Sequence, residues 1–201
     1  KVTRRCNGNF SDQKSEKKKV IEVIDQQLIT KSGQYELKAV DGQLQSDTDQ
    51  DILKLAVINR YNDSPPALGF VKNFGIKKGA IASSVAHDSH NIIVTGTNDQ
   101  DMMDAVNRII KYKGGITAVC KDDNINEILP LPIAGLMTDT DYETTAKNYS
   151  KLDSISKKFG SELSAPFMTL SFMGLLVIPD LKLSDLGLFD GINFKITDLY
   201  L

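Results

Sequence analysis

Residues 80–94 read AIASSVAHDSHNIIV, and this stretch determines how the surrounding chain is interpreted. Two apolar runs with the length of buried strands flank five consecutive polar residues, from His87 to Asn91. Asp88 and Ser89, in the middle of the polar group, are residue types that favour turns. We therefore predict a strand, a turn and a second strand, with the polar side chains at the tip.

The chain's only two histidines, His87 and His90, lie in this stretch. On a continuous strand, residues three apart point to opposite faces, so the two imidazoles can share a ligand only if the chain bends between them. An imidazole can bind a metal or move a proton near neutral pH, and Asp88 could orient either ring or bind metal itself. Asp, Ser and Asn at a turn also cap backbone groups. The residue types alone leave both an active-site cluster and a structural turn open.

Strand-like segments surround this stretch. They are rich in β-branched residues or alternate between apolar and polar side chains, and they cover residues 20–24, 35–40, 51–61, 69–74, 116–120 and 125–131. Ser32-Gly33 is expected to turn the chain between the first two strands. Asp41-Gly42 is a two-residue turn of the kind that closes a hairpin.

Two segments carry the apolar periodicity of a helix. The first begins at Asn98, a good N-cap, and ends at Gly114-Gly115. The second covers about residues 140–159 with Gly160 as its C-cap, and its expected apolar face is Tyr142, Ala146, Tyr149, Leu152, Ile155 and Phe159. Because strands and helices interleave, we predict one α/β or α+β domain with a mixed β-sheet and at least two well-defined helices.

The composition excludes several classes of protein. Of 201 residues, 41% are hydrophobic, enough to fill a core. The 24 Lys+Arg against 26 Asp+Glu argue against a nucleic-acid-binding module. No apolar run is long enough to cross a bilayer, and no signal peptide is evident at the start, so we expect a cytoplasmic protein without a membrane partner. Cys6 and Cys120 predict neither a disulfide framework nor a zinc ribbon.

Residues 1–19 differ from the rest, because they are rich in lysine and arginine and contain few apolar side chains. We expect them to form a linker or arm, with the domain covering residues 20–201. Residue 1 is Lys rather than Met, so the chain is expected to be already under way at this point.

Several longer stretches go beyond composition: GFVKNFG (69–75), KGAIASSVAHDSHN (78–91), GTND (96–99), LPLPIAGLM (129–137), PFMTLSF (166–172) and VIPDLKL (177–183). With these stretches the chain resembles the C-terminal domain of bacterial adenine deaminases, of the amidohydrolase superfamily. The similarity extends from about Val20 to the end of the chain.

The resemblance implies a hydrolase of purine salvage that converts adenine and water into hypoxanthine and ammonia. It also implies a divalent metal, manganese or iron, that activates the attacking water and is held mainly on a (β/α)8 barrel preceding this region. The chain has no HxH motif and too few residues for such a barrel. We therefore expect it to be the C-terminal part of the enzyme, inactive by itself, with adenine, the barrel and a further copy of itself as partners.

If the polar tip completes the barrel's active site, His87, Asp88 and His90 are the expected catalytic residues. Ser89 and Asn91 would then hydrogen-bond the purine edges, and His87 and His90 are the residues that could supply metal ligands. The alternative is a non-catalytic assembly or oligomerisation module of the same enzyme, in which the polar cluster is structural. A third interpretation is a free-standing purine-binding protein.

Overall fold

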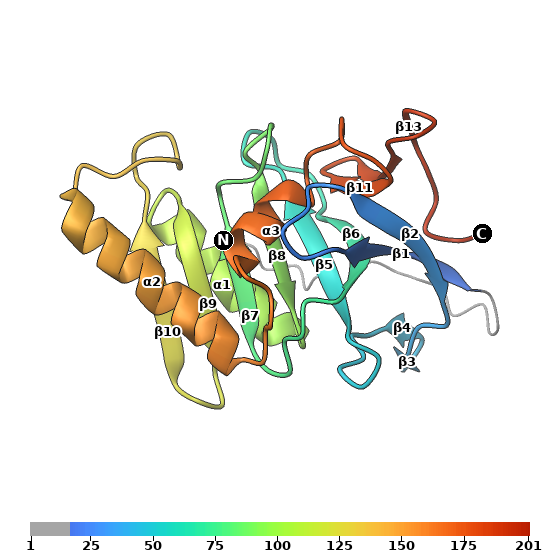
Figure 1. Ribbon diagram of the computed structural model, residues 1–201, viewed down its shortest axis with the longest axis horizontal. Helices are drawn as coiled ribbons and strands as arrows, with labels where there is room; N and C mark the ends of the chain where they lie inside the picture. The colour runs from blue at the N-terminus through green and yellow to red at the C-terminus, as the bar shows by residue number, and fades with distance from the viewer. Residues whose placement is uncertain (1–16) are drawn as a thin grey trace.

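The computed structural model describes residues 17–201, whose strands form a central eight-stranded sheet (Figure 1). In chain order its strands are β1 (Lys18–Val23), β2 (Thr30–Tyr35), β5 (Ile52–Ile58), β6 (Ala67–Lys72), β7 (Ala80–Ser83), β8 (Ile92–Gly96), β9 (Gly115–Cys120) and β10 (Ile125–Pro130). Their spatial order is β10-β9-β7-β8-β5-β6-β1-β2. β1 and β6 pair in parallel and the other neighbours antiparallel, so the sheet is mixed, as predicted. Most of the predicted arm at residues 1–19 lies outside the described residues.

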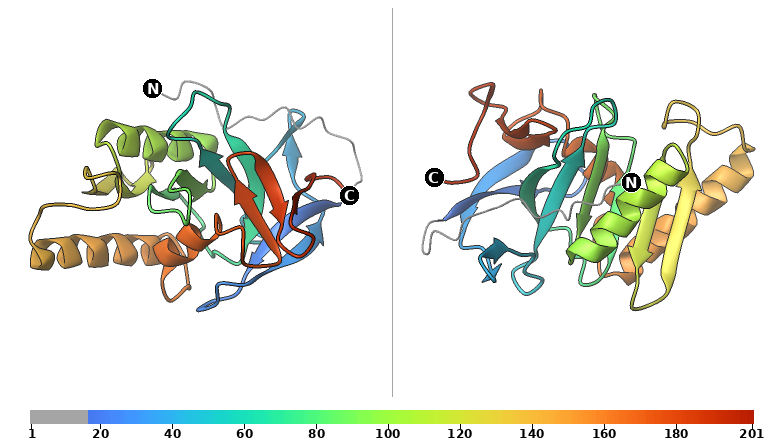
Figure 2. Two further views of the ribbon diagram at one scale, coloured as in Figure 1. Left: turned by 90° about the horizontal axis from the view of Figure 1, so that it is seen from above. Right: turned by 180° about the vertical axis from the view of Figure 1, so that it is seen from behind.

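Helices cover both faces of the sheet. α1 (Asp99–Lys111) packs on one face, and α2 (Tyr142–Lys158) and α3 (Pro166–Phe172) pack on the other (Figure 2). Each face of the sheet has its own hydrophobic core. β5 is buried along its whole length because its side chains point alternately into the two cores. Leu53 and Leu55 belong to the core on the α2 and α3 side, whereas Ala56 and Ile58 belong to the core under α1. The predicted α+β domain is confirmed.

Two smaller sheets complete the fold. β3 (Ala39–Val40) and β4 (Gln43–Leu44) form the predicted hairpin, and both residues of its turn, Asp41 and Gly42, have positive φ. β11 (Leu181–Ser184), β12 (Gly187–Asp190) and β13 (Lys195–Ile196) form a second small sheet beside β6. None of the helices among residues 17–201 has the length and hydropathy to span a membrane.

The first predicted helix is confirmed at its N-terminus. The Asn98 side chain accepts a hydrogen bond from the Asp101 amide at 2.8 Å, and Asp99 and Asp101 provide negative charge in the first turn of α1. The second helix ends one residue earlier than predicted, because Phe159 and not Gly160 is its C-cap; Gly160 follows with a φ of +114°.

The turn predicted at Ser32-Gly33 is wrong, because both residues lie inside β2 and the chain turns earlier. Gly33 lies beside a cross-strand hydrogen bond of 2.6 Å from the Tyr35 hydroxyl to the Glu22 carboxylate. A Cβ at Gly33 would collide with both of those side chains. The glycine therefore makes room for this hydrogen bond and does not reverse the chain.

The predicted apolar face of the second helix is wrong over its first turns. Tyr142 is 80% exposed and Ala146 is also exposed, whereas Leu152 and Ile155 are buried. Figure 1 shows the reason, because the N-terminal end of α2 extends past the edge strand β10. The sheet therefore covers only the C-terminal part of this helix.

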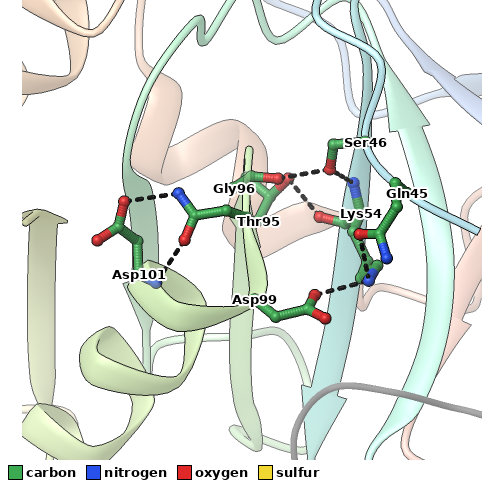
Figure 3. A network of polar contacts seen from close by, with 8 residues as sticks. Gln45, Ser46, Lys54, Thr95, Gly96, Asp99 and Asp101 are labelled. Carbon is green, nitrogen blue, oxygen red and sulfur yellow. Dashed lines mark hydrogen bonds and ion pairs between the residues drawn. The ribbon is translucent and has the colours of Figure 1, made fainter. Parts of the chain in front are cut away.

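A polar network fixes the end of β5 and β8 at which α1 begins (Figure 3). The buried Lys54 ammonium lies 2.6 Å from the Asp99 carboxylate. The Ser46 hydroxyl accepts a hydrogen bond from the Lys54 amide and donates one to the Gly96 carbonyl, both at 2.8 Å. These contacts join the region after β4, strand β5 and the start of α1.

Candidate functional site

The polar tip lies at the end of β5 and β8 that is opposite to the Lys54–Asp99 ion pair. β5, β7 and β10 end there and β6, β8 and β9 begin there, as their antiparallel registers require. The connections at residues 59–66, 84–91 and 131–141 therefore lie along one edge of the sheet, the upper edge in Figure 1. We refer to these three connections as the site edge and to residues 84–91 as the tip. The predicted strand–turn–strand is confirmed, with β7 and β8 as its paired strands.

The tip is anchored where it leaves β7. The buried Ser84 hydroxyl donates a hydrogen bond to the Gly135 carbonyl at 2.6 Å and accepts one from the Gly115 amide at 2.8 Å. Further along, the His87 amide donates to the Ser171 carbonyl of α3 at 3.2 Å, and the His90 amide donates to the Ala86 carbonyl at 2.7 Å. The second of these bonds closes a turn from residue 86 to residue 90.

This turn brings the two histidine rings together. Their centroids lie 5.5 Å apart with the planes at 67°, so the chain bends between them as the sequence requires for any joint role. The His87 ring also stacks on Phe172 of α3, with centroids 5.0 Å apart. Both histidines are partly buried, and Phe172 fixes the position of the first ring.

The environment of His90 favours its neutral form. Burial lowers the pKa of this imidazole below its ordinary value, electrostatic interaction with His87 and Arg60 lowers it further, and Asp88 opposes the shift. Its Nδ1 is buried and has no hydrogen-bond partner among the described residues. A protonated ring would bury an unpaired N–H at this position, and for this reason too the neutral imidazole is favoured.

The remaining predicted site residues lie in two environments. Asp88 and Ser89 are exposed at the turn, where their side chains can meet a ligand or another domain. Asn91 is buried, and its Oδ1 accepts a hydrogen bond of 3.0 Å from the Arg60 amide. Asn91 therefore connects the tip to the segment after β5 inside the protein, whereas Asp88 and Ser89 form the outer surface of the tip.

Sequence reasoning did not identify Arg60, Tyr61 and Phe172 as parts of this region. Arg60 and Tyr61 follow β5 and donate hydrogen bonds to main-chain carbonyls of the tip. Phe172 lies in the PFMTLSF stretch, which resembles the adenine deaminase family, but that resemblance gives no indication of a stack on His87.

The residues present do not by themselves fit the divalent metal that the resemblance implies. Within residues 17–201, no group of three His, Cys, Asp or Glu side chains is arranged to hold a metal ion. His87 and His90 could provide two ligands at most, and catalytic metal sites typically use three from the protein. A complete centre would need ligands from outside the described chain.

The fold and the tip define an α+β domain that presents two imidazoles at one edge of its sheet, without a complete metal site among the described residues. Residues 27–195 match the family described as the adenine deaminase C-terminal domain, and the chain belongs to this family. The resemblance based on the sequence stretches above is therefore confirmed.

The chain can also be compared with full-length proteins that contain this domain. The chain is 48% identical to an adenine deaminase of Parabacteroides distasonis over 93% of this chain and 34% of that protein. It is 48% identical to an adenine deaminase of Methanosarcina mazei, over 96% of this chain and 35% of that protein. An adenine deaminase of Sulfurovum sp. is 53% identical over 89% of this chain and 32% of that protein. The chain spans about a third of the length of these curated relatives.

Proposed function

We propose that this chain is the part of an adenine deaminase that brings the tip to the substrate pocket, and that the whole protein converts adenine and water into hypoxanthine and ammonia. The observation that carries the proposal is the pair of imidazoles 5.5 Å apart at the sheet edge of a domain from this family. The divalent metal, manganese or iron, would be held by the preceding part of the protein. Purine salvage and a cytoplasmic location belong to the same proposal.

The reaction needs two proton movements for which the tip has suitable groups. The attacking water gives up both of its protons as its oxygen becomes the C6 carbonyl of hypoxanthine. One proton ends on N1 of the ring, and the other ends on the amino group, which leaves as ammonia. A neutral His90 imidazole can accept a proton from the water and deliver it to the amino group, and the remaining proton then moves to N1. The exposed Ser89 side chain can hydrogen-bond a purine edge, and the exposed Asp88 carboxylate can orient a histidine ring or hold a proton. His87, held against Phe172, lies beside His90 and limits where its ring can move.

Exposed apolar side chains beside the tip support a partner at this edge. Tyr61 is 65% exposed, Ile133 45% and Met137 55%, and all three belong to connections of the site edge. Large exposed apolar groups that cluster around polar residues are typical of interaction surfaces. We propose that the preceding domain of the longer protein covers them and so encloses the tip.

The test is ammonia release from adenine in the presence of manganese, measured for this chain alone and for this chain mixed with the preceding part of the protein. Activity is expected only in the mixture. His90→Ala and Asp88→Asn should then lower kcat by about 100-fold or more, with unchanged melting temperatures. Wild-type rates from both variants would refute the catalytic role of the tip, and activity of the chain alone would refute the need for a preceding domain.

A second candidate, assembly of copies of the enzyme, is favoured by a different surface. In the C-terminal sheet and its turns, Leu186 is 79% exposed, Ile192 69% and Phe194 67%. A homo-oligomer that buries these residues would make the domain an assembly module. Sedimentation of the assembled protein tests this role, since Phe194→Asp should dissociate the oligomer without changing the chemistry at the tip.

A further inference from the structure

Arg60 connects two parts of the site edge. It lies two residues beyond the end of β5, and its guanidinium donates to two main-chain carbonyls. Nη1 lies 3.1 Å from the His90 carbonyl oxygen in the tip, and Nη2 lies 2.7 Å from the Ala134 carbonyl oxygen in the connection after β10. A planar guanidinium suits this geometry, because its donors form a rigid fork that can bridge two acceptors.

Three consecutive residues of the tip are bound by Arg60 or its neighbour. Besides the bond to His90, the Arg60 amide donates to Asn91 Oδ1 at 3.0 Å, and the Tyr61 hydroxyl donates to the Ser89 carbonyl at 2.9 Å. Asn59 Oδ1 accepts hydrogen bonds from the Tyr61 amide at 2.7 Å and from the Asn62 amide at 2.8 Å. These bonds hold residues 59–62, which include Arg60, in a turn. The tip is thus tied to the segment after β5 through two of its main-chain carbonyls and the Asn91 side chain.

The two residues whose carbonyls bind the Arg60 guanidinium have unusual backbone angles. His90 has a φ of +52° and Ala134 a φ of +56°, a left-handed conformation that side-chain-bearing residues rarely adopt. Such conformations persist where surrounding contacts determine them, and Arg60 binds the carbonyl of each residue. The neighbouring Gly135 packs so closely on the guanidinium that a Cβ there would collide with it.

We propose that Arg60 is a positioning residue that sets the orientation of His90 and couples the tip to residues 131–137. Its catalytic consequence depends on the proposed function, but its structural part does not. Without the fork, the His90 carbonyl loses its donor and the left-handed turn loses one of its constraints. The imidazole then samples several orientations, and the connection at residues 131–137 loosens with it.

The structural part is tested by hydrogen exchange on this chain with Arg60→Met, Arg60→Lys and the control Lys78→Met. Lys78 forms an ion pair of 2.6 Å with Asp123 at the opposite end of β7, with 49% of its side chain exposed. Arg60→Met should speed exchange about tenfold or more at the His90 amide and in residues 131–137, with β5 and β8 unchanged. Arg60→Lys should recover part of the protection. Unchanged exchange at the site edge in Arg60→Met, or equal effects from Lys78→Met, would overturn the proposal.

Gly135→Ala gives a second variant, because its Cβ displaces the guanidinium while the Arg60 side chain is unchanged. Gly135 has a φ of +77°, so alanine also strains residues 131–137 directly, and the readout is therefore the His90 amide in the tip, which should gain exchange. Protection of this amide equal to wild type would count against the inference. In the assembled enzyme, Arg60→Met should lower kcat by about 10- to 100-fold and leave KM for adenine within about threefold. An inactive assembled wild type would refute the proposed function alone, whereas a wild-type kcat in Arg60→Met would refute the positioning role.

Discussion

The imidazole of His87 lies nearly parallel to the ring of Phe172, with centroids 5.0 Å apart and planes at 22°. The contact joins the tip to the C-terminal residue of α3, close to the hydrogen bond from the His87 amide to the Ser171 carbonyl. A side-chain and a main-chain contact therefore hold the same residue against one helix. Of the two histidines, His87 has the more firmly fixed ring.

Phe172→Leu should release this ring at modest cost to the fold. Replacing a partly buried aromatic stack by an aliphatic side chain removes about 1 kcal/mol. We expect that loss in the free energy of unfolding from urea denaturation, together with narrower His87 ring signals in NMR spectra. Phe194→Leu is the matched control, because Phe194 contacts Phe189 edge to face and is 67% exposed. An equal loss of stability in both variants would show that the His87 stack contributes nothing specific.

Lys54→Met should be more damaging, although methionine has a similar length and suits a buried strand. The Lys54 side chain is 3% exposed and that of Asp99 is 18% exposed, so removal of the ammonium leaves a largely buried carboxylate unpaired. We expect a loss of about 2 to 3 kcal/mol in the free energy of unfolding. The double variant Lys54→Met/Asp99→Asn should recover part of the loss in urea denaturation. A double variant no more stable than Lys54→Met would argue against the ion pair as the cause.

The sequence predicted those elements that depend on neighbouring residues. The Asn98 side chain accepts a hydrogen bond from the amide three residues further along the chain. The Asp41-Gly42 turn joins β3 and β4, the strands that flank it in the sequence. The polar residues after β7 interrupt two apolar runs, so the tip was visible as a local change of composition. Local chemistry therefore accounts for the correct helix start and for both hairpins.

Contacts between distant residues account for what the sequence did not predict. Alternation of apolar residues along β5 indicates a half-buried strand, but Lys54 is buried because Asp99, 45 residues further on, neutralises it. Arg60 binds carbonyls 30 and 74 residues away. Every residue has a main-chain carbonyl, so the sequence does not indicate which of them accept these bonds. The support of the tip therefore needed the structure, whereas its polar outer surface did not.

Two glycines with the same φ of +74° should respond differently to alanine. At Gly42 a Cβ would meet nothing within 4 Å, so Gly42→Ala costs only the left-handed conformation, about 1 kcal/mol. At Gly79 a Cβ would lie 2.5 Å from the Val119 carbonyl oxygen, which adds a backbone collision. We expect Gly79→Ala to lose about 3 kcal/mol or more in thermal denaturation. Equal melting temperatures for the two variants would contradict this steric explanation.

Lys182 makes a contribution of its own to the pH dependence of the protein's stability. Its side chain is fully buried in β11, and its ammonium donates to the Leu28 carbonyl at 2.7 Å. Burial lowers the pKa of this amine from 10.5 to about 8, although Asp180 opposes the shift. Between these two values the Lys182 amine binds more protons in the unfolded chain than in the folded one, so its contribution to the free energy of unfolding rises with pH across that interval.

Lys182→Met should remove this rise and stabilise the protein at pH 7, where the wild type must bury a charge. The shift corresponds to about 3 kcal/mol at most, and the loss of the bond to Leu28 offsets part of it, so we expect a net gain of about 2 kcal/mol. Urea denaturation at pH 7 and pH 10 should therefore show a stability difference between variant and wild type that shrinks at the higher pH. Lys147→Met, on the exposed face of α2, controls for loss of a lysine in general. A difference between Lys182→Met and wild type that stays constant across this interval would mean that the buried amine keeps its ordinary pKa.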